Sequence, residues 1–430
     1  MITPDYLNEI MQGTESAILD LNEYLMRRIA KRILNAFMDG ANNLIIPATQ
    51  ADMKLLMQGG MLYEEIEAEI TKRLPQLKQV IKEAFLQSAQ EITEQNQVFC
   101  TQLVESYGLN IAIPSYEKVK LPKSAKELYL TSVEIKSLEN AYKRTNGTVS
   151  NMVKTMPKNA VQAYTQACDN AYVKVKRGIP LQQAVVEAIK EVSDNGLTVD
   201  DVIEYSGRKD KPEVAIARAV RTGINQASSE IVLERCAELG VGYVKVSEHL
   251  GARVTKNNDY TNHSWWQGQV YSLDWNKPEL SKYVPQKESI EKSFEWMDEI
   301  QKTLNEEKEI KYPDFVNTCG YGKIQGIIGI NCRHTFFMFD PKVNIDRGQE
   351  IDPVQNEKMY KLTQQQRALE RKIRKIKRQI EALKATDYLD EDAFKEEKKK
   401  LNRKLKQASD DYMSFCRINK LKPRNMSLKV

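Results

Sequence analysis

The sequence predicts a mainly α-helical protein with a long helical N-terminal region, a small α+β domain and a C-terminal antiparallel helical hairpin. Three observations lead to this prediction. Apolar residues recur mostly at steps of three and four through residues 1–240, as on the buried face of a helix. All three histidines and all four tryptophans fall between residues 241 and 345, among β-forming residues and glycines. Two heptad-like stretches separated by a short polar break fill much of 346–430.

The composition is that of a chain that folds in water. It has 430 residues, enough for two or three domains with their own cores, and 41% of them are apolar and 29% charged. No segment approaches the run of about 18 apolar residues that a transmembrane helix needs. The N-terminus lacks the basic and apolar regions of a secretory signal. Six dispersed cysteines fit a reducing compartment, so we expect synthesis in the cytoplasm.

The N-terminal region, 1–240, is expected to consist of helices that bind a partner through their apolar faces. The strongest is the last, because Pro212 suits a first-turn position and Gly240 suits the position after the end. Pro75 is expected to interrupt the helical pattern, and 111–122, with two prolines, is expected to be a connector. The predicted helices cover 16–39, 51–57, 63–74, 77–106, 123–145, 157–175, 181–194, 199–205 and 212–239.

The second domain is predicted to span 241–345 and to begin with a strand over Val241–His249, which is rich in β-forming residues. Four of its side chains could bind zinc, which favours imidazole and thiolate ligands; they are His263, Cys319, Cys332 and His334. Their spacing matches no common zinc motif. The alternative is a buried cysteine beside histidines that hydrogen-bond to loops. If a metal binds, we expect a closed structural site.

An acid–base site is a second interpretation of this domain. His249, Arg253, Asp259 and His263 lie within 15 positions, and a carboxylate that orients a histidine is one form of a general base. A metal-dependent nuclease could use His263, Asn331 and His334. The alternative is a hydrogen-bonded network that holds together a loop-rich fold.

Two further features of this domain favour structural roles. The glycines at 320, 322, 326 and 329 match neither phosphate-binding pattern, and they suit positive φ angles in tight turns. The aromatic cluster is expected to be core rather than a ligand platform; it comprises Trp265, Trp266, Tyr271 and Trp275.

The C-terminal region, 346–430, is predicted to be a basic hairpin arm. Apolar residues from Leu362 to Leu383 and from Phe394 to Phe415 both step by seven, four, three, four and three, which is an a/d seam. Each arm of about 24 residues would be roughly 36 Å long. Residues 361–430 hold 21 Lys and Arg against 10 Asp and Glu, a net charge of +11, which suggests an acidic partner or nucleic acid. A solvated charged helix is the alternative.

Three motifs resemble those of the phage minor capsid protein family, which is related to phage head-morphogenesis proteins. The first is HLGARVTKNNDYTNHSWWQGQVYS, residues 249–272. The second runs from Gly320 to His334 and ends in NCRH, and the third lies on the hairpin as QRALERKIRKIKR, residues 366–378. They occur in the family's order over about 130 residues. Two departures are Asp340–Pro341, where the family often has Pro-Gly, and Cys319, which the family pattern does not include.

The resemblance implies a minor head protein of a tailed phage, a structural virion component rather than an enzyme. It implies a place in the head interior or at the portal vertex, with the portal and major capsid proteins as partners. The charge of the basic arm adds packaged double-stranded DNA as a candidate partner, and the lack of a long apolar run predicts no membrane contact. Such proteins are thought to assist head assembly, DNA packaging or ejection. The rival interpretations are a head-packaged nuclease or transferase that uses 241–345, and a nucleic-acid-binding protein outside any virion.

We expect no cofactor, a structural zinc ion on His263, Cys332 and His334 being the one candidate exception. The side chains expected to define the second domain form a structural network, and they are Arg253, His263, Trp266, Gln267, Gly268, Asn331, Cys332, Arg333 and His334. The side chains expected to face DNA or a partner are Arg367, Arg371, Arg374, Lys377 and Arg378.

Overall fold

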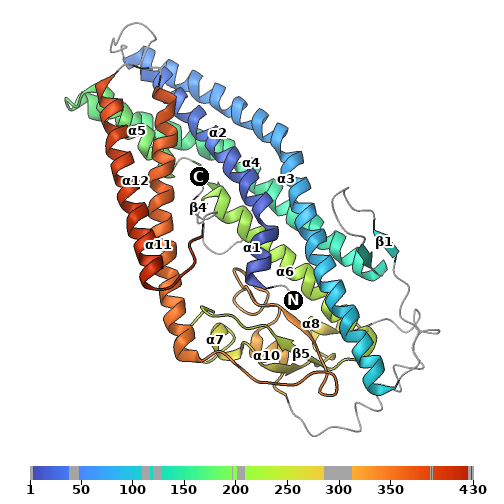
Figure 1. Ribbon diagram of the computed structural model, residues 1–430. Helices are drawn as coiled ribbons and strands as arrows, with labels where there is room; N and C mark the ends of the chain where they lie inside the picture. The colour runs from blue at the N-terminus through green and yellow to red at the C-terminus, as the bar shows by residue number, and fades with distance from the viewer. Residues whose placement is uncertain are drawn as a thin grey trace. The chain divides into compact units, whose positions relative to one another are not determined.

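The computed structural model is mainly α-helical, with one three-stranded sheet and two short two-stranded pairings among its described residues. The predicted fold class is therefore confirmed: helices dominate, a small α+β region follows the N-terminal helices, and a helical hairpin ends the chain (Figure 1). The structure describes residues 3–37, 48–108, 117–119, 128–130, 132–195, 197–200, 209–284, 312–387, 389, 391–424 and 428.

The chain forms two compact units, each assembled from three separate stretches. Unit 1 comprises residues 1–11, 81–146 and 218–363, and unit 2 comprises 12–80, 147–217 and 364–430. Four long helices contribute residues to both units: α3 (Ala48–Tyr107), α4 (Ser132–Lys176), α6 (Pro212–Leu239) and α11 (Pro353–Leu383). A division of function at residues 240 and 345 stays a prediction.

Unit 1 contains the small sheet. Strand β5 (Tyr243–Val246) lies in the middle and pairs antiparallel with β6 (Val270–Ser272) and with β7 (Phe336–Phe339). Three short helices accompany the strands: α7 (His263–Trp266), α8 (Pro278–Ser281) and α10 (Phe315–Cys319). The core beside the sheet is aromatic, with Phe315 and Phe336 packed edge to face at 4.9 Å between ring centroids. This packing fixes the loops that carry the candidate site.

The remaining elements of unit 1 are helical or short strands. Helix α1 (Pro4–Ile10) opens the chain, and β1 (Glu117–Val119) pairs antiparallel with β2 (Leu128–Leu130). Helix α6 lies close against its neighbours, because a Cβ at Gly223 would stand 2.0 Å from Thr145 Oγ1. A fully buried ion pair joins α4 to α6: Arg235 Nη2 donates to Glu134 Oε1 at 2.7 Å.

Unit 2 packs the hairpin against two other helices. Helix α11 runs antiparallel beside α12 (Asp392–Ile418), after the short 3-10 helix η2 (Lys384–Thr386), as Figure 1 shows. The predicted seam is buried or half-buried throughout, from Leu362 to Leu383 and from Phe394 to Phe415. Helices α2 (Gln12–Phe37) and α5 (Leu181–Asn195) cover the hairpin, and Lys190 on α5 pairs with Glu397 on α12 at 2.6 Å.

Two prolines lie inside helices that the sequence pattern divided. Pro75 was expected to separate two helices, but α3 continues through it for 60 residues. Pro157 likewise lies within the 45 residues of α4. A mid-helix proline costs about 3 kcal/mol through one lost hydrogen bond and a clash. Burial of Ile70, Leu77 and Met156 on the flanking turns supplies apolar contact that offsets such a cost.

Two further expectations from local pattern need correction. Residues 199–205 were expected to be helical, but Val199–Asp200 is strand β3, paired with β4 (Lys209–Asp210), and 201–205 lie outside the described residues. The helix expected over 123–145 begins only at Ser132, after β2. Within the expected connector 111–122, the structure describes only β1. Short cross-strand pairings determine the conformation of these segments, and the apolar periodicity of one segment does not predict such pairings.

Candidate functional site

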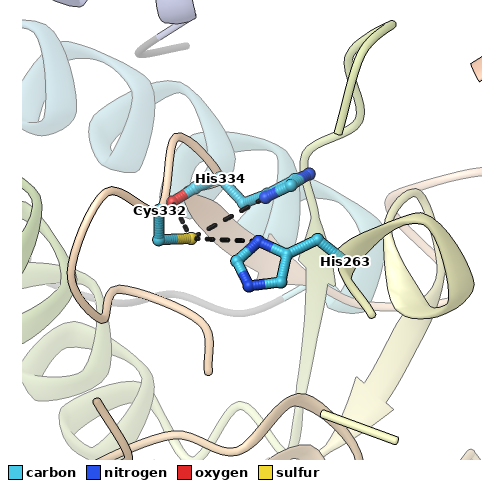
Figure 2. Close-up of side chains that lie close together, drawn as sticks. All are labelled: His263, Cys332 and His334. Carbon is cyan, nitrogen blue, oxygen red and sulfur yellow. Dashed lines mark hydrogen bonds between the residues drawn. The ribbon is translucent and has the colours of Figure 1, made fainter. Parts of the chain in front are cut away.

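Three donor side chains that are far apart in the sequence meet in unit 1. His263 comes from α7, and Cys332 and His334 come from the loop that enters β7 (Figure 2). The Cys332 sulfur lies 3.9 Å from His263 Nδ1 and 3.7 Å from His334 Nδ1. The three donor atoms lie within 4.8 Å of one another. The structure thus brings together the three predicted metal ligands.

The three side chains are almost completely buried, with 2%, 2% and 1% exposure for His263, Cys332 and His334. Burial lowers the pKa of His263 to about 4 and that of His334 well below its ordinary value, because a charged imidazole loses its hydration there. Burial also raises the pKa of the Cys332 thiol to about 11. Both imidazoles are therefore neutral at pH 7.

Side chains around His263, Cys332 and His334 donate hydrogen bonds to backbone carbonyls of loops. Arg253 Nη1 donates to the Gln325 carbonyl at 3.2 Å, and its Nη2 donates to the Ile330 carbonyl at 3.3 Å. Trp266 Nε1 donates to the Tyr260 carbonyl at 3.0 Å. These carbonyls belong to irregular segments that have no sheet ladder to pair with, so the side chains replace the missing backbone partners.

Two predicted network residues position the loop before β6. Gln267, which is fully buried, accepts at Oε1 from the His249 backbone N–H at 3.0 Å. Gly268 has φ +73°, and a Cβ there would stand 2.6 Å from Glu248 Oε2. Glu248 Oε2 in turn accepts from two backbone N–H groups, those of Glu350 and Ile351, both at 3.1 Å. A side chain at position 268 would disrupt that contact.

The glycine-rich segment before NCRH forms tight turns. Gly320 and Gly322 have positive φ, as the sequence predicted. Gly326 is required for a different reason, because a Cβ there would stand 2.0 Å from the Gly320 carbonyl oxygen. Close approach of backbone to backbone, rather than phosphate binding, therefore accounts for the glycines.

The acid–base constellation is not assembled among the described residues. Asp259 accepts from the Thr261 N–H and hydroxyl, and these hydrogen bonds lower the pKa of its carboxyl. His263 Nε2 instead lies 2.9 Å from the Gln325 carbonyl oxygen. Asn331, expected beside the histidines in a nuclease, is exposed and has a positive φ of 59°.

The other predicted residues of this domain are mixed in burial. Arg333 is half-buried, as is Trp275. The aromatic cluster divides: Trp266 and Tyr271 are core, whereas Trp265 is 40% exposed. The Cys319 thiol is buried and shares a hydrogen bond with the Tyr271 side chain. It is not part of the donor group formed by His263, Cys332 and His334.

The Asp340 carboxylate stabilises the turn at Asp340–Pro341. Asp340 accepts at Oδ1 from the Lys342 N–H at 2.9 Å, and both its oxygens lie 3.2 Å from the Tyr107 hydroxyl. Its carbonyl accepts from Asn344 N–H at 2.7 Å. These bonds close the turn without the Pro-Gly pair common in the family.

Several of the basic side chains predicted to face a partner have internal contacts. Lys377 Nζ donates to the Leu428 carbonyl at 2.7 Å, and Arg378 Nη1 donates to Glu213 at 3.2 Å. Burial lowers the pKa of Arg374. Arg367 is half-buried, whereas Arg371 is exposed.

A second basic surface, not among the predicted site residues, lies on α12. Five exposed cations lie within eight consecutive residues of this helix: Lys399, Lys400, Arg403, Lys404 and Lys406. The signal was present, because these positions avoid the seam positions Leu401, Leu405 and Ala408 on the same helix. We call these five residues the α12 basic surface.

Comparison with known families matches residues 2–413 to the family described as Phage minor capsid protein 2. The match covers nearly the whole chain, so this protein belongs to the phage minor capsid family and is a virion protein. No curated protein and no solved structure gives a significant match. Among the described residues, no helix is both long and apolar enough to cross a bilayer.

Proposed function

We propose that this chain is a structural component of a tailed-phage head, bound near the portal, where it assists head assembly, DNA packaging or ejection. Family membership supports the virion role. The observation that carries the finer proposal is a pair of exposed surfaces of opposite character, one apolar and one basic. The apolar surface would bind capsid or portal protein, and the basic surface would bind packaged DNA.

The apolar surface lies at the start of α3. Met53, Leu56, Met57 and Met61 are 73%, 77%, 57% and 42% exposed. They follow one another at steps of three, one and four, so they share one side of the helix. Flexible methionines suit binding to apolar surfaces of varied shape. Exposed clusters of this kind mark protein interaction sites.

The basic surface is the α12 basic surface. Among the described residues, Lys400 of this surface pairs with Glu397 at 3.6 Å. The hairpin sequence carries a net charge of +11 over residues 361–430. Exposed Lys and Arg at this density bind phosphates with release of counterions, so affinity should fall steeply as salt rises.

The location is tested by cryo-electron microscopy of purified virions with quantitative mass spectrometry. We expect a low copy number and density at the portal vertex. Phage heads assembled with the Leu56→Glu, Met57→Glu double variant should contain much less of this protein than wild-type heads do. Charged side chains on the apolar surface oppose its binding. Absence of the wild-type protein from particles would overturn the proposal.

DNA binding is tested by titration of double-stranded DNA at several salt concentrations. Replacement of the α12 basic surface by alanine should reduce the slope of log K against log salt by about 4 to 5, the value for five phosphate contacts. A matched control removes five exposed lysines elsewhere, and these are Lys72, Lys82, Lys136, Lys154 and Lys158. An equal effect of both variants would mean that DNA binds by net charge alone and not at α12.

We assign the 241–345 domain a structural rather than a catalytic role. Its three candidate metal-binding or nucleophilic side chains are enclosed, with His263, Cys332 and His334 at most 2% exposed. A substrate atom must reach a catalytic group to hydrogen-bonding distance. Cleavage of DNA by the purified protein, lost on His263→Ala, would contradict this assignment.

A further inference from the structure

We propose that His263, Cys332 and His334 bind one zinc ion through the Nδ1 atoms of the two imidazoles and the thiolate of Cys332. The proposal rests on the orientation of the donor atoms and is independent of the portal and DNA proposals. Zinc takes imidazole nitrogen and thiolate sulfur in tetrahedral sites. The donors converge on one point between α7 and the loop before β7 (Figure 2).

The hydrogen bonding of His263 determines which of its ring nitrogens carries the proton. Its Nε2 lies 2.9 Å from the Gln325 carbonyl oxygen, which can only accept a hydrogen bond. Nε2 must therefore carry the proton. A neutral imidazole with a proton on Nε2 has a bare lone pair on Nδ1, and it is Nδ1 that faces the Cys332 sulfur.

The side chain of Gln267 determines in the same way which ring nitrogen of His334 carries the proton. The His249 backbone N–H donates to Gln267 Oε1, and this fixes which end of the amide is oxygen. His334 Nε2 lies 3.1 Å from that same oxygen, so Nε2 carries the proton. The lone pair of His334 is therefore also on Nδ1, pointing at Cys332.

Both outer hydrogen bonds are of the kind that metal-binding histidines make. A ligating imidazole usually donates its other N–H to a carbonyl or carboxylate oxygen, which sets the tautomer and the ring direction. His263 uses a backbone carbonyl and His334 uses an amide carbonyl. Asn225 adds a third support, because its Nδ2 donates to the Cys332 carbonyl at 3.1 Å.

The two sulfur–nitrogen distances are close to those between ligands of one tetrahedral ion. With Zn–S about 2.3 Å and Zn–N about 2.0 Å, sulfur and nitrogen on a tetrahedron lie about 3.6 Å apart. The observed separations are 3.7 and 3.9 Å. A thiol has one proton for the two buried nitrogen lone pairs that face it. A cation satisfies both lone pairs at once.

Zinc binding would release the Cys332 thiol proton to solvent and leave a thiolate in the site. Three protein donors meet there, which leaves one tetrahedral position of the ion to a further ligand. The nearby positive charge of Arg253 is engaged by the Gln325 and Ile330 carbonyls. The ion would join α7 to a loop 69 residues further along the chain, and it would thereby hold segments that have little regular structure.

The test is elemental analysis of the full-length protein purified from cells and then incubated with Zn²⁺ and dialysed. We expect about one zinc per chain. Replacement of zinc by Co²⁺ should give the near-ultraviolet thiolate charge-transfer band and the intense visible bands of tetrahedral cobalt. Less than a tenth of an equivalent, with no cobalt–thiolate band, would overturn the proposal; neither readout requires a variant to fold.

The matched variants are Cys332→Ala and Cys236→Ala, each of which removes one buried thiol from unit 1. We expect at least a tenfold loss of bound zinc from the first and no loss from the second. Equal zinc content in the two variants would overturn the assignment to Cys332. His334→Gln should lose the ion while keeping the circular dichroism of the folded protein.

Discussion

In the 241–345 domain, polar side chains donate to the carbonyls of loops, whereas the hairpin also holds an enclosed group of polar side chains that bond to one another. Arg253 and Trp266 bind the carbonyls of loops. On the hairpin, Glu370 accepts both Arg424 Nε and Nη2 at 2.9 Å and the Tyr412 hydroxyl at 3.2 Å. The difference follows from the backbone: a helix satisfies its own carbonyls, and an irregular loop does not.

The two regions are therefore sensitive to different substitutions. The loop-rich domain depends on side chains that support the backbone, so their loss should loosen a whole segment. The hairpin depends on packing along the seam and on a few enclosed charge pairs, so loss of an exposed pair should matter little. Loss of stability on substitution should therefore be greatest for an enclosed side chain that supports a loop and least for an exposed ion pair.

Trp266→Ala should have the largest effect. The side chain is fully buried and its Nε1 supports the Tyr260 carbonyl, so we expect a loss of about 3 to 5 kcal/mol. Hydrogen exchange of the β5–β7 amides would measure it. The adjacent Trp265, 40% exposed, provides a matched control, and Trp265→Ala should cost much less. Equal costs would remove the distinction between the two rings.

Glu370→Gln should destabilise the hairpin by about 2 to 4 kcal/mol, because it leaves Arg424 without its charge partner in a largely buried position. Thermal unfolding of unit 2, followed by hydrogen exchange in α11 and α12, is the measurement. Glu396→Gln, at an exposed position on α12, is the control. A change below about 0.5 kcal/mol would show the pair to behave like a surface pair.

Lys211→Met should stabilise unit 2 at neutral pH by about 1 to 3 kcal/mol. Burial, reinforced by the charge of Arg378, lowers the pKa of Lys211 to about 8, from 10.5. The unfolded chain then binds more protons between pH 8 and 10.5, so this lysine makes stability rise with pH in that window. The difference in unfolding free energy between wild type and variant should therefore shrink from pH 7 to pH 10.5. A constant difference would contradict the assigned cause.

Lys361→Ala should have the smallest effect. Lys361 pairs with Glu357 at 2.6 Å, but the two side chains are 70% and 50% exposed. Screening and side-chain entropy leave such pairs about 0 to 0.5 kcal/mol. A loss above 1 kcal/mol in denaturant unfolding would mean that exposed pairs also stabilise α11, and the comparison would need revision.

Sequence patterns predicted helix ends well where local signals mark them. Pro212 and Gly240 bracket α6, and Gly240 has the positive φ of 66° typical of a helix end. The helix breaks predicted at Pro75 and Pro157 were wrong, because tertiary packing outweighed the local cost of a proline inside a helix. Two-residue strands such as β3 escaped notice, since their stability comes from the partner strand β4.

The candidate site was predictable in composition but not in geometry. His263, Cys332 and His334 stood out as donors, and Cys319 looked equally suitable. Only the fold turns Cys319 toward Tyr271 and brings Cys332 between the two histidines. The hydrogen bonds of Gln325 and Gln267 that set the imidazole tautomers join residues more than 60 positions apart, beyond the reach of spacing rules.

All six cysteines are free, five are buried and Cys100 is partly buried. Burial raises the pKa of Cys100 to about 11 and that of Cys168 to about 12, so these sulfurs remain protonated and react slowly with oxidants. A particle that leaves its host meets air and loses the cell's reductants. A chain with its thiols enclosed in this way should therefore form disulfides with its neighbours only slowly.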